Sequence, residues 1–410
     1  MPMKKALTII LLVLLNSAYS QNVKLTSKPV CIDNFDNIAE LDKIFSSSRI
    51  ILLGEAGHGD GATFELKTKL IKYLYEKHNY TILINEASGF IETVNMNQEQ
   101  VIPSQSFEKT ADTKFSLSEQ YKGLKLFLAE NPSFKYYGLD CQPLNVELFF
   151  NNLNNLLNRT SNSSVKAYLA NVISYYEQAT SRKEFVLTLD DLKALDSITV
   201  SYSNNLKIFN HTDDIYIKQL LLNIQANVHI AIHNIEEMSY SYKSINWRDS
   251  VMALNVDYIV NKFPNKKVII SAANFHNAKS IHKIYRNEDS TYYTKIQPCG
   301  WHIANNYKDK AYSIAIASTS GTFGYCTDTS VYDITEVAKF KIDENVLETH
   351  LPIPNCEISF YDFRNDKALE TQVYRSLIFG TNMHRGKWST AFDGIINIKN
   401  QKASIPIKVE

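Results

Sequence analysis

Residues 49–87 decide the fold, and they read RIILLGEAGHGDGATFELKTKLIKYLYEKHNYTILINEA. The apolar run at 49–53 is typical of a buried strand, and it ends in a cluster of glycines. Residues 62–77 carry apolar side chains at the spacing of one helix face, and 81–87 form a second strand-like run. A strand, a helix and a strand in this order form a βαβ unit, in which the two strands run parallel. The segment therefore predicts a parallel sheet.

The rest of the chain extends this pattern around a helical segment. Between about 144 and 265 the strand pattern gives way to helical periodicity, for example at 215–238, which predicts a helical insertion. We expect an α/β protein whose largely parallel central sheet is flanked by helices, in one domain over 21–410. The further strands are predicted at 134–141, 268–272, 311–317 and 391–398.

The composition indicates a globular protein and argues against one class of partner. Among 410 residues, 43 Lys and Arg balance 43 Asp and Glu, while 24 Tyr and 20 Phe supply apolar surface for a core. A disordered chain would combine a large net charge with few aromatic residues. The balanced charge also lacks the attraction for phosphates on which nucleic-acid binding depends. We therefore expect no nucleic-acid partner.

The first twenty residues are expected to be a cleavable signal peptide. Lys4 and Lys5 precede an apolar run of about ten residues, which is too short to span a bilayer. Ala18-Tyr19-Ser20 then fits the small-x-small cleavage rule. We expect a secreted or periplasmic protein with no stable membrane insertion after cleavage, and an uncleaved anchor is the alternative.

The cysteines are compatible with disulfides but not with a structural zinc site. Their odd number requires at least one free thiol or an intermolecular bond, and export permits disulfides. No CxxC pair and no cysteine–histidine cluster has zinc spacing. Cys141 follows an apolar run and is expected to be a buried small hydrophobe. The five are Cys31, Cys141, Cys299, Cys326 and Cys356.

Polar side chains follow four of the predicted strands. Ligands of open parallel sheets bind outside the carboxyl ends of the strands, where the loops diverge. We therefore expect these side chains to converge on one site. Glu55 and His58 follow the first strand, Glu86 ends the second, Asp140 ends the third, and Asn274 and His276 follow the fourth.

Several common site chemistries are disfavoured by the motifs that the chain lacks. The glycine loop at 54–61 has neither the Lys-Ser/Thr ending of a P-loop nor the GxGxxG spacing of a dinucleotide site. HExxH and GxSxG do not occur, which argues against a zinc protease and a nucleophile-elbow hydrolase. A histidine acting as general base toward water remains. A metal held by His58, Glu86 and His276 is the alternative.

Five motifs, in order, resemble those of the erythromycin esterase-like family over nearly the whole mature chain. The family's opening GE-x-x-HG is followed by a helix and then by a strand that ends in Glu. The matching segments are GEAGHGDGATFELKTKLIKYL at 54–74, INEASGF at 84–90, YGLDCQ at 137–142, NWRDSVMALNV at 246–256 and SAANFHNAK at 271–279.

The resemblance implies a hydrolase that opens an ester or lactone, as in a macrolide, with water and without a covalent intermediate. It implies no cofactor and no metal. His58 would be the general base, Glu55 its partner, and Glu86, Arg248 and His276 a polar wall that positions water and stabilises the oxyanion. Further substrate-binding side chains are expected at Lys67, Asp140 and Asn274.

Two positions depart from the family pattern. Lys67 stands where the family usually has Arg, and lysine keeps the charge but lacks the planar fork of arginine. Ala273 replaces the first His of the family's A-H-N-x-H, so that only His276 remains. The loss of the histidine at position 273 leaves open a non-catalytic protein that binds a small molecule, in addition to the metal-dependent hydrolase named above.

Overall fold

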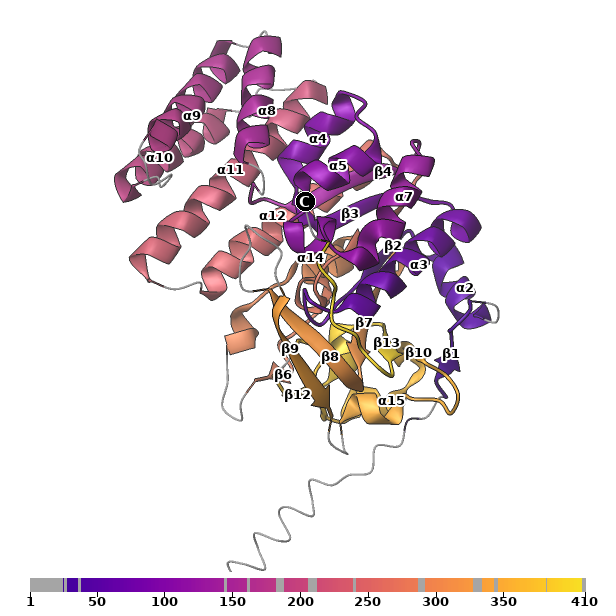
Figure 1. Ribbon diagram of the computed structural model, residues 1–410. Coiled ribbons are helices and arrows are strands. Elements are labelled where there is room, and N and C mark those ends of the chain that lie inside the picture. Colours follow the sequence, from indigo (N-terminus) through magenta and orange to yellow (C-terminus); the bar gives the residue numbers. More distant parts are fainter. Residues whose placement is uncertain are drawn as a thin grey trace, which may run out of the picture.

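The computed structural model is built around an eight-stranded sheet (Figure 1). The strands from β13 to β4 run parallel, and β10 and β1 extend one edge antiparallel. The order is β1 (Val30–Cys31), β10 (Ile358–Asp362), β13 (Gly394–Ile398), β7 (Ala311–Ser318), β2 (Ile50–Leu53), β5 (Lys267–Ser271), β3 (Tyr80–Gly89) and β4 (Lys135–Asp140). The structure describes residues 25, 28–35, 38–143, 146–160, 163–181, 188–205, 212–238, 241–286, 292–326, 334–342, 346–380 and 382–407.

This sheet confirms the predicted α/β class. All six predicted strands are present, and they are the parallel ones. The two strands of the opening βαβ unit, β2 and β3, are not direct neighbours, because β5 lies between them. The local sequence gives no sign of this insertion. The strands whose ends carry the predicted site residues, β2, β5, β3 and β4, are therefore consecutive neighbours.

Both faces of the sheet are covered, which explains the continuous apolar runs. Successive side chains of a strand point to opposite faces. Ile50 and Leu52 belong to one buried cluster, which includes residues of α8–α12, whereas Ile51 and Leu53 belong to another, which includes residues of α2, α3 and α7. A strand that is buried on both sides has no polar face, so apolar and polar residues do not alternate along it.

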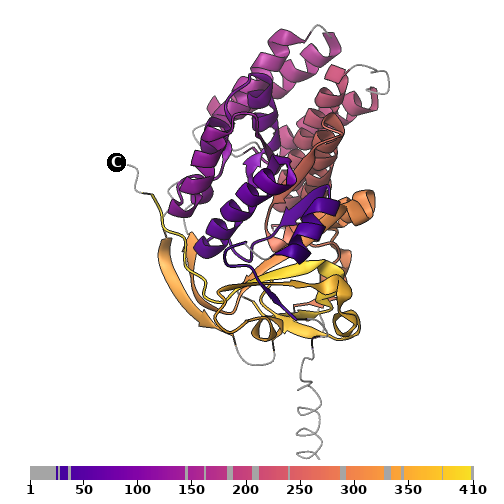
Figure 2. The same cartoon turned by 90° about the vertical axis from the view of Figure 1, so that its right-hand side faces the viewer.

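The helical insertion is present, and its helices are long. α8 (Val146–Arg159), α9 (Ser163–Ser181), α10 (Leu189–Asn205) and α11 (Thr212–Glu236) gather at one end of the molecule, opposite the late strands (Figures 1 and 2). α12 (Tyr242–Lys262) packs against β4. Across the described residues, no helix has both the length and the apolar character that a membrane crossing requires.

The remaining elements surround the sheet. The helices are α2 (Ala39–Ser47), α3 (Gly61–His78), α4 (Phe90–Gln98), α5 (Pro103–Thr110), α6 (Thr113–Ser116), α7 (Lys122–Glu130), α13 (Asn274–Asn277), α14 (Cys299–Tyr307), α15 (Lys367–Thr371) and α16 (Trp388–Ala391). Short 3-10 turns are η1 (Glu119–Tyr121), η3 (Tyr292–Lys295), η4 (Lys308–Lys310), η5 (Leu347–His350) and η6 (Phe363–Asn365). β8 (Ser320–Cys326) and β9 (Ile334–Lys341) form an antiparallel ribbon, and β11 (Tyr374–Ser376), β12 (His384–Gly386) and β6 (Ile284–Tyr285) form a small sheet.

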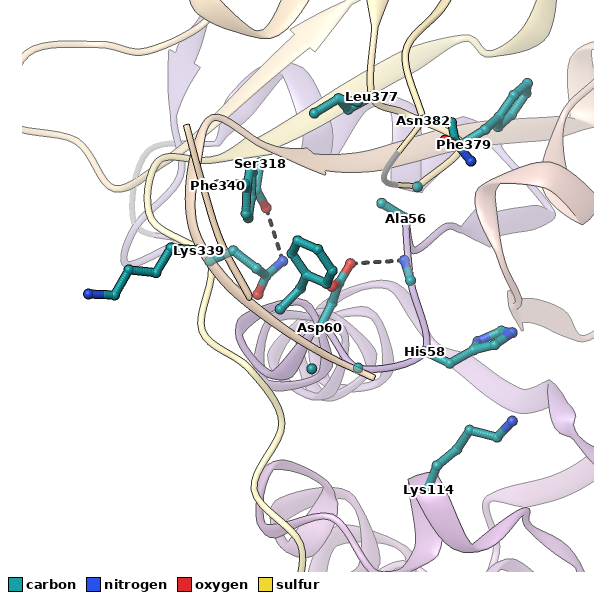
Figure 3. Close-up of a pocket in the computed structure, with 16 residues that line it drawn as sticks. Ala56, His58, Asp60, Lys114, Ser318, Lys339, Phe340, Leu377, Phe379 and Asn382 are labelled. Atoms are coloured by element: carbon teal, nitrogen blue, oxygen red, sulfur yellow. Dashed lines mark hydrogen bonds between the residues drawn. The ribbon is translucent and has the colours of Figure 1, made fainter. Parts of the chain in front are cut away.

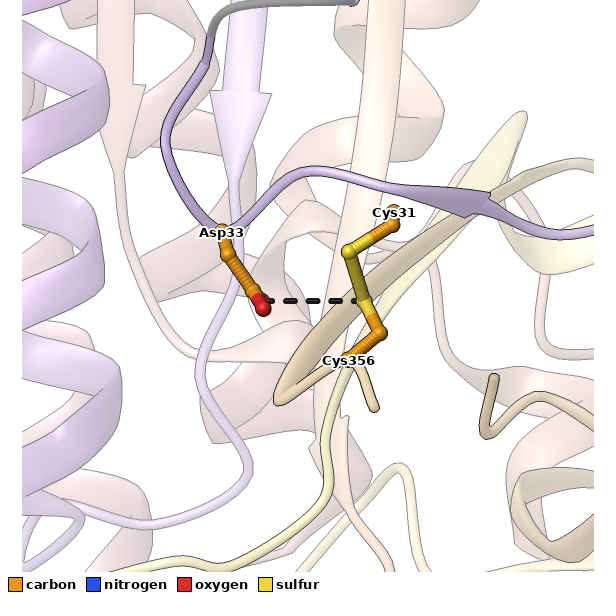
Figure 4. A group of neighbouring side chains, drawn as sticks. All are labelled: Cys31, Asp33 and Cys356. Atoms are coloured by element: carbon orange, nitrogen blue, oxygen red, sulfur yellow. Dashed lines mark hydrogen bonds between the residues drawn. A yellow bond between two sulfur atoms is a disulfide. The ribbon is translucent and has the colours of Figure 1, made fainter. Parts of the chain in front are cut away.

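A disulfide joins the edge strand β1 to the segment before β10. Cys31 and Cys356 are bonded, and the carboxylate of Asp33 lies beside them (Figure 4). The same carboxylate accepts hydrogen bonds from the backbone N–H groups of Glu357 and Ile358. Cys141 is buried, as predicted, and its thiol is free. The predicted signal peptide lies outside the described residues.

Candidate active site

The loop between β2 and α3 carries Glu55 and His58 and is held between two other parts of the chain. A side chain at Gly54 would place its Cβ 1.8 Å from the Asn274 side chain, and one at Gly59 would lie 1.9 Å from the Gly324 carbonyl oxygen. Glycine is therefore required at both positions, because no larger residue fits. The loop is fixed by α13 on one side and by the β8–β9 ribbon on the other.

Glu55 is a buried carboxylate with two partners. Its Oε1 lies 2.7 Å from His58 Nδ1, and its Oε2 accepts a hydrogen bond of 2.7 Å from Lys67 Nζ. Glu55 and Lys67 are 2% and 1% exposed, whereas the His58 side chain is 43% exposed. Burial raises the pKa of Glu55, but the charge of Lys67 and the bond to His58 outweigh this and hold the pKa below its ordinary value. The carboxylate therefore stays ionised.

His58 is oriented by this pair. With Nδ1–H donated to Glu55, the second ring nitrogen, Nε2, is left to take up a proton. Partial desolvation lowers the pKa of His58, but the bond to Glu55 and the charges of Glu55 and Glu86 outweigh it and raise the pKa above its ordinary value.

A cleft of about 760 Å³ opens beside His58 (Figure 3). The loop after β2 forms one wall, with Lys114 of α6 on the same side as His58, and the β8–β9 ribbon contributes Phe323 and Phe340. Phe379 adds a third aromatic ring to the lining. Asp60 also lines the cleft, and its carboxylate accepts a hydrogen bond of 2.9 Å from Gly57 N–H. Burial and the charge of Glu55 raise the pKa of Asp60 to about 7.

Glu86 lies where β3 departs from regular pairing. The register between β3 and β4 shifts between Asn85 and Gly89, and such irregularities re-aim side chains beside functional sites. Glu86 Oε2 accepts a hydrogen bond of 2.6 Å from Ala273 N–H. Burial raises the pKa of Glu86, but the charges of His276, His58 and Arg248 outweigh it and hold the pKa well below its usual range.

Arg248 reaches this edge of the sheet from α12. Its Nη2 donates to Asp140 Oδ2 at 2.7 Å and to Glu86 Oε1 at 3.4 Å, and its Nε also faces Asp140. The Asp140 carboxylate is almost fully buried, whereas 16% of the Arg248 side chain is exposed. A carboxylate that accepts from two nitrogens along one edge of a guanidinium fixes its plane, so Asp140 orients Arg248.

His276 completes this group. Its Nδ1 lies 2.7 Å from Asp249 Oδ1, and its Nε2 lies 3.2 Å from Arg248 Nη1 and 3.3 Å from Glu86 Oε1. Burial lowers the pKa of His276, but the charges of Asp249 and Glu86 outweigh it and raise the pKa above its ordinary value. Two carboxylate–histidine pairs, Glu55–His58 and Asp249–His276, thus interact electrostatically with one carboxylate, Glu86.

In the part of the chain that the structure describes, the three side chains of the metal alternative are not close enough together to bind one metal ion. There, the one group of three potential ligand side chains within 4.8 Å is Cys31, Asp33 and Cys356, two of which form the disulfide. His58, Glu86 and His276 do not form such a group. Nδ1 of His58 is hydrogen-bonded to Glu55, and Nδ1 of His276 is hydrogen-bonded to Asp249.

The three residues predicted to bind the substrate are all buried, and their polar atoms have partners within the protein. Lys67 is buried behind Glu55, and Asp140 is buried behind Arg248. Both amide protons of Asn274 go to the backbone carbonyls of Ile316 and Ile378. The geometry does not support direct substrate contact for these three, because burial and existing bonds occupy their polar atoms. Lys67 instead pairs with the equally buried Glu55, and Asp140 pairs with the partly exposed Arg248.

Sequence reasoning missed Asp249 as a site residue. It directly follows Arg248 in the segment NWRDSVM, where an acid at the start of a helix would need no site to explain it. The helix α12 begins earlier, at Tyr242, so Asp249 lies beyond its first turn and that explanation does not apply. The pairing of Asp249 with His276 depends on the approach of α12 to α13, which no local pattern encodes. The only available signal was its place inside the family motif.

Comparisons with known proteins agree with this fold. The family model described as erythromycin esterase matches residues 128–401, which include Asp140, Arg248 and His276, whereas Glu55, His58 and Glu86 precede the match. The protein YbfO of Bacillus subtilis (strain 168), which is named as a hydrolase, is 21% identical over 93% of this chain and 91% of its own.

Two solved structures share the architecture over most of their length. A succinoglycan biosynthesis protein superimposes with a TM-score of 0.70 at 18% identity, covering 92% of this chain and 94% of its own. A mutant of the erythromycin esterase EreC in its open conformation gives a TM-score of 0.65 at 18% identity, covering 94% of this chain and 100% of its own. At these identities the likeness extends to the fold alone.

Proposed function

Because the chain belongs to the erythromycin esterase family, we propose that it hydrolyses an ester or macrolactone bond of a small molecule with water activated by His58. The observation that carries the proposal is the Glu55–His58 pair, in which Glu55 is buried while the histidine ring faces an open cleft. A carboxylate on one ring nitrogen leaves the other to act as a base.

The reaction begins with a water molecule between His58 and the ester carbonyl. His58 Nε2 takes a proton from the water as its oxygen bonds to the carbonyl carbon, and Glu55 stabilises the imidazolium that forms. The ester C–O bond then breaks, and the proton on His58 passes to the leaving alkoxide. The products are a carboxylic acid and an alcohol, and no bond to the protein forms.

Arg248 and His276 supply positive charge for the oxyanion. Stabilisation of a developing negative charge by pre-oriented donors is usually the largest catalytic contribution. Asp140 holds the guanidinium plane, and the raised pKa of His276 favours its cationic form. Glu86 stays ionised, and its charge favours the protonated forms of both histidines. This assignment gives each of the five residues a distinct part.

The substrate is proposed to occupy the cleft beside His58. A volume of about 760 Å³ is within the range of sites for drug-sized ligands. Phe323, Phe340 and Phe379 offer apolar contacts, as an ester with a hydrocarbon skeleton or macrolide ring would require.

The proposal is tested by offering the purified protein erythromycin and a set of chromogenic esters, with and without EDTA. We expect turnover of at least one substrate, an unchanged rate in EDTA, and no acyl-enzyme in the intact mass after rapid quenching. A rate abolished by EDTA and restored by metal would favour the metal-dependent alternative. No turnover of any substrate, together with saturable binding, would favour the non-catalytic alternative.

The pH dependence of kcat/KM should report His58. Because Glu55 raises the pKa of His58, the rate should rise with pH through an apparent pKa above 6.5. Glu55→Gln removes the charge that stabilises the imidazolium, so this acidic limb should move to lower pH while the maximum rate falls. Glu65→Gln, on the exposed side of α3, is the matched control and should leave the limb unchanged. A limb that stays in place in Glu55→Gln would contradict the pairing.

We further propose that the mature protein acts outside the cytoplasm. The signal-like first twenty residues support export, and the Cys31–Cys356 disulfide is of the kind that persists in oxidising compartments.

A further inference from the structure

Asp249 has no part in the reaction described so far, yet it is bonded to one of the histidines. It lies on α12 directly after Arg248 and is completely buried. Its Oδ1 lies 2.7 Å from His276 Nδ1 and also accepts a hydrogen bond of 2.8 Å from the backbone N–H of Cys299, the first residue of α14. Asp249 therefore connects three helices at one oxygen atom.

We propose that Asp249 is a positioning residue that fixes the ring of His276 and keeps it in the cationic form. The inference rests on the proposed function, because His276 is there an oxyanion-stabilising group. The carboxylate accepts Nδ1–H, which directs Nε2 toward Glu86 and Arg248. Nε2 is thus the atom that gains or loses a proton at the site.

The second oxygen of Asp249 argues against a purely structural role. Oδ2 is buried and has no hydrogen-bond partner among the described residues. Oδ1 alone serves both His276 and Cys299, so hydrogen bonding does not require the second oxygen, and a buried oxygen without a partner costs stability. The carboxylate is therefore explained by its charge, which the imidazolium of His276 requires.

Several other groups act on His276 and must be considered with Asp249. Arg248 opposes its positive charge and Glu86 favours it, while Asp140 partly compensates Arg248. On α14, Cys299 and His302 both interact with Asp249 electrostatically. Asp249 is the only carboxylate in direct contact with Nδ1 among the described residues. Its removal should therefore lower the proton affinity of His276 beyond what the other groups can restore.

The test compares Asp249→Asn with Asp257→Asn. Asp257 is a matched control because it is also an α12 carboxylate bonded to α14, through Tyr307 and Asn306, but it does not touch His276. In Asp249→Asn, the alkaline limb of the kcat profile should move to lower pH by roughly 1–3 pH units, the range expected for loss of an adjacent charge. Asp257→Asn should leave this limb in place.

A second measurement is independent of turnover. A histidine-selective NMR titration, with His276 assigned by comparison with His276→Gln, should show its midpoint lowered in Asp249→Asn and unchanged in Asp257→Asn. An unchanged midpoint in Asp249→Asn would overturn the inference. If the protein cleaves no ester but the midpoint moves, Asp249 still positions His276 and only the proposed function fails.

Discussion

Replacing His58 with alanine is expected to lower kcat for ester hydrolysis by about 10²–10⁴-fold, the usual contribution of a positioned general base. The side chain lines the cleft and holds its Nδ1 2.7 Å from a buried carboxylate, so its removal leaves water without a base. KM should change less, because the aromatic lining of the cleft remains. Initial rates on a substrate cleaved by the wild type would measure both constants.

The matched control is His78→Ala. His78 also pairs with a carboxylate at 2.7 Å, that of Asp42, but it lies at the opposite end of α3 from the loop that carries His58. This variant should keep kcat within a few-fold of the wild type. A His58→Ala enzyme that was equally active would contradict the assignment of the base.

Lys67→Met is expected to lower the free energy of unfolding by about 3–5 kcal/mol, the usual cost of removing one partner of a buried ion pair. Lys67 and Glu55 are 1% and 2% exposed, so the remaining carboxylate cannot be solvated. The same change should lower kcat, because a neutralised or displaced Glu55 no longer supports His58. Denaturant unfolding gives the stability, and initial rates give the activity.

Two further variants separate charge from packing. Lys69→Met alters an exposed lysine two residues along the same helix and should change stability little. Glu55→Gln combined with Lys67→Met should be more stable than Lys67→Met alone, since neither charge of the buried Lys67–Glu55 pair remains. Equal stability of Lys67→Met and Lys69→Met would contradict the buried pair.

The parallel sheet could be predicted because its strands are apolar on both faces. The runs at 49–53 and 268–272 stand out from their surroundings for this reason. The bounds of the observed β2 and β5 differ from these predicted ranges by no more than one residue at either end. The position of β5 between β2 and β3 could not be predicted, because strand order depends on contacts distant in the sequence. The exact pairing of the later strands, such as the β8–β9 ribbon that lines the cleft, was equally inaccessible.

The sequence was enough to predict which strand ends meet at the candidate site. It was not enough to predict the hydrogen-bonding partner of each site residue. Glu55 and His276 follow strands that are neighbours of β3 or of each other in the sheet, so the rule for parallel sheets brings them to one edge. Glu86 was predicted to end its strand, but β3 continues to Gly89 and Glu86 lies inside its irregular last part. The burial of Lys67 behind Glu55 depends on the direction in which α3 packs. The Asp249–His276 pair depends on the approach of α12 to α13. Both are tertiary contacts that follow from the assembled core.

The pH profile of kcat/KM, measured for the wild type and for His58→Ala on the same ester, tests the central claim most directly. With His58 as the base, the wild-type rate rises through an apparent pKa above 6.5, because Glu55 and Glu86 raise the pKa of the histidine. We predict that the residual activity of His58→Ala lacks this acidic limb. A variant that retained the limb at the same pH would show that another group is the base and would contradict the account.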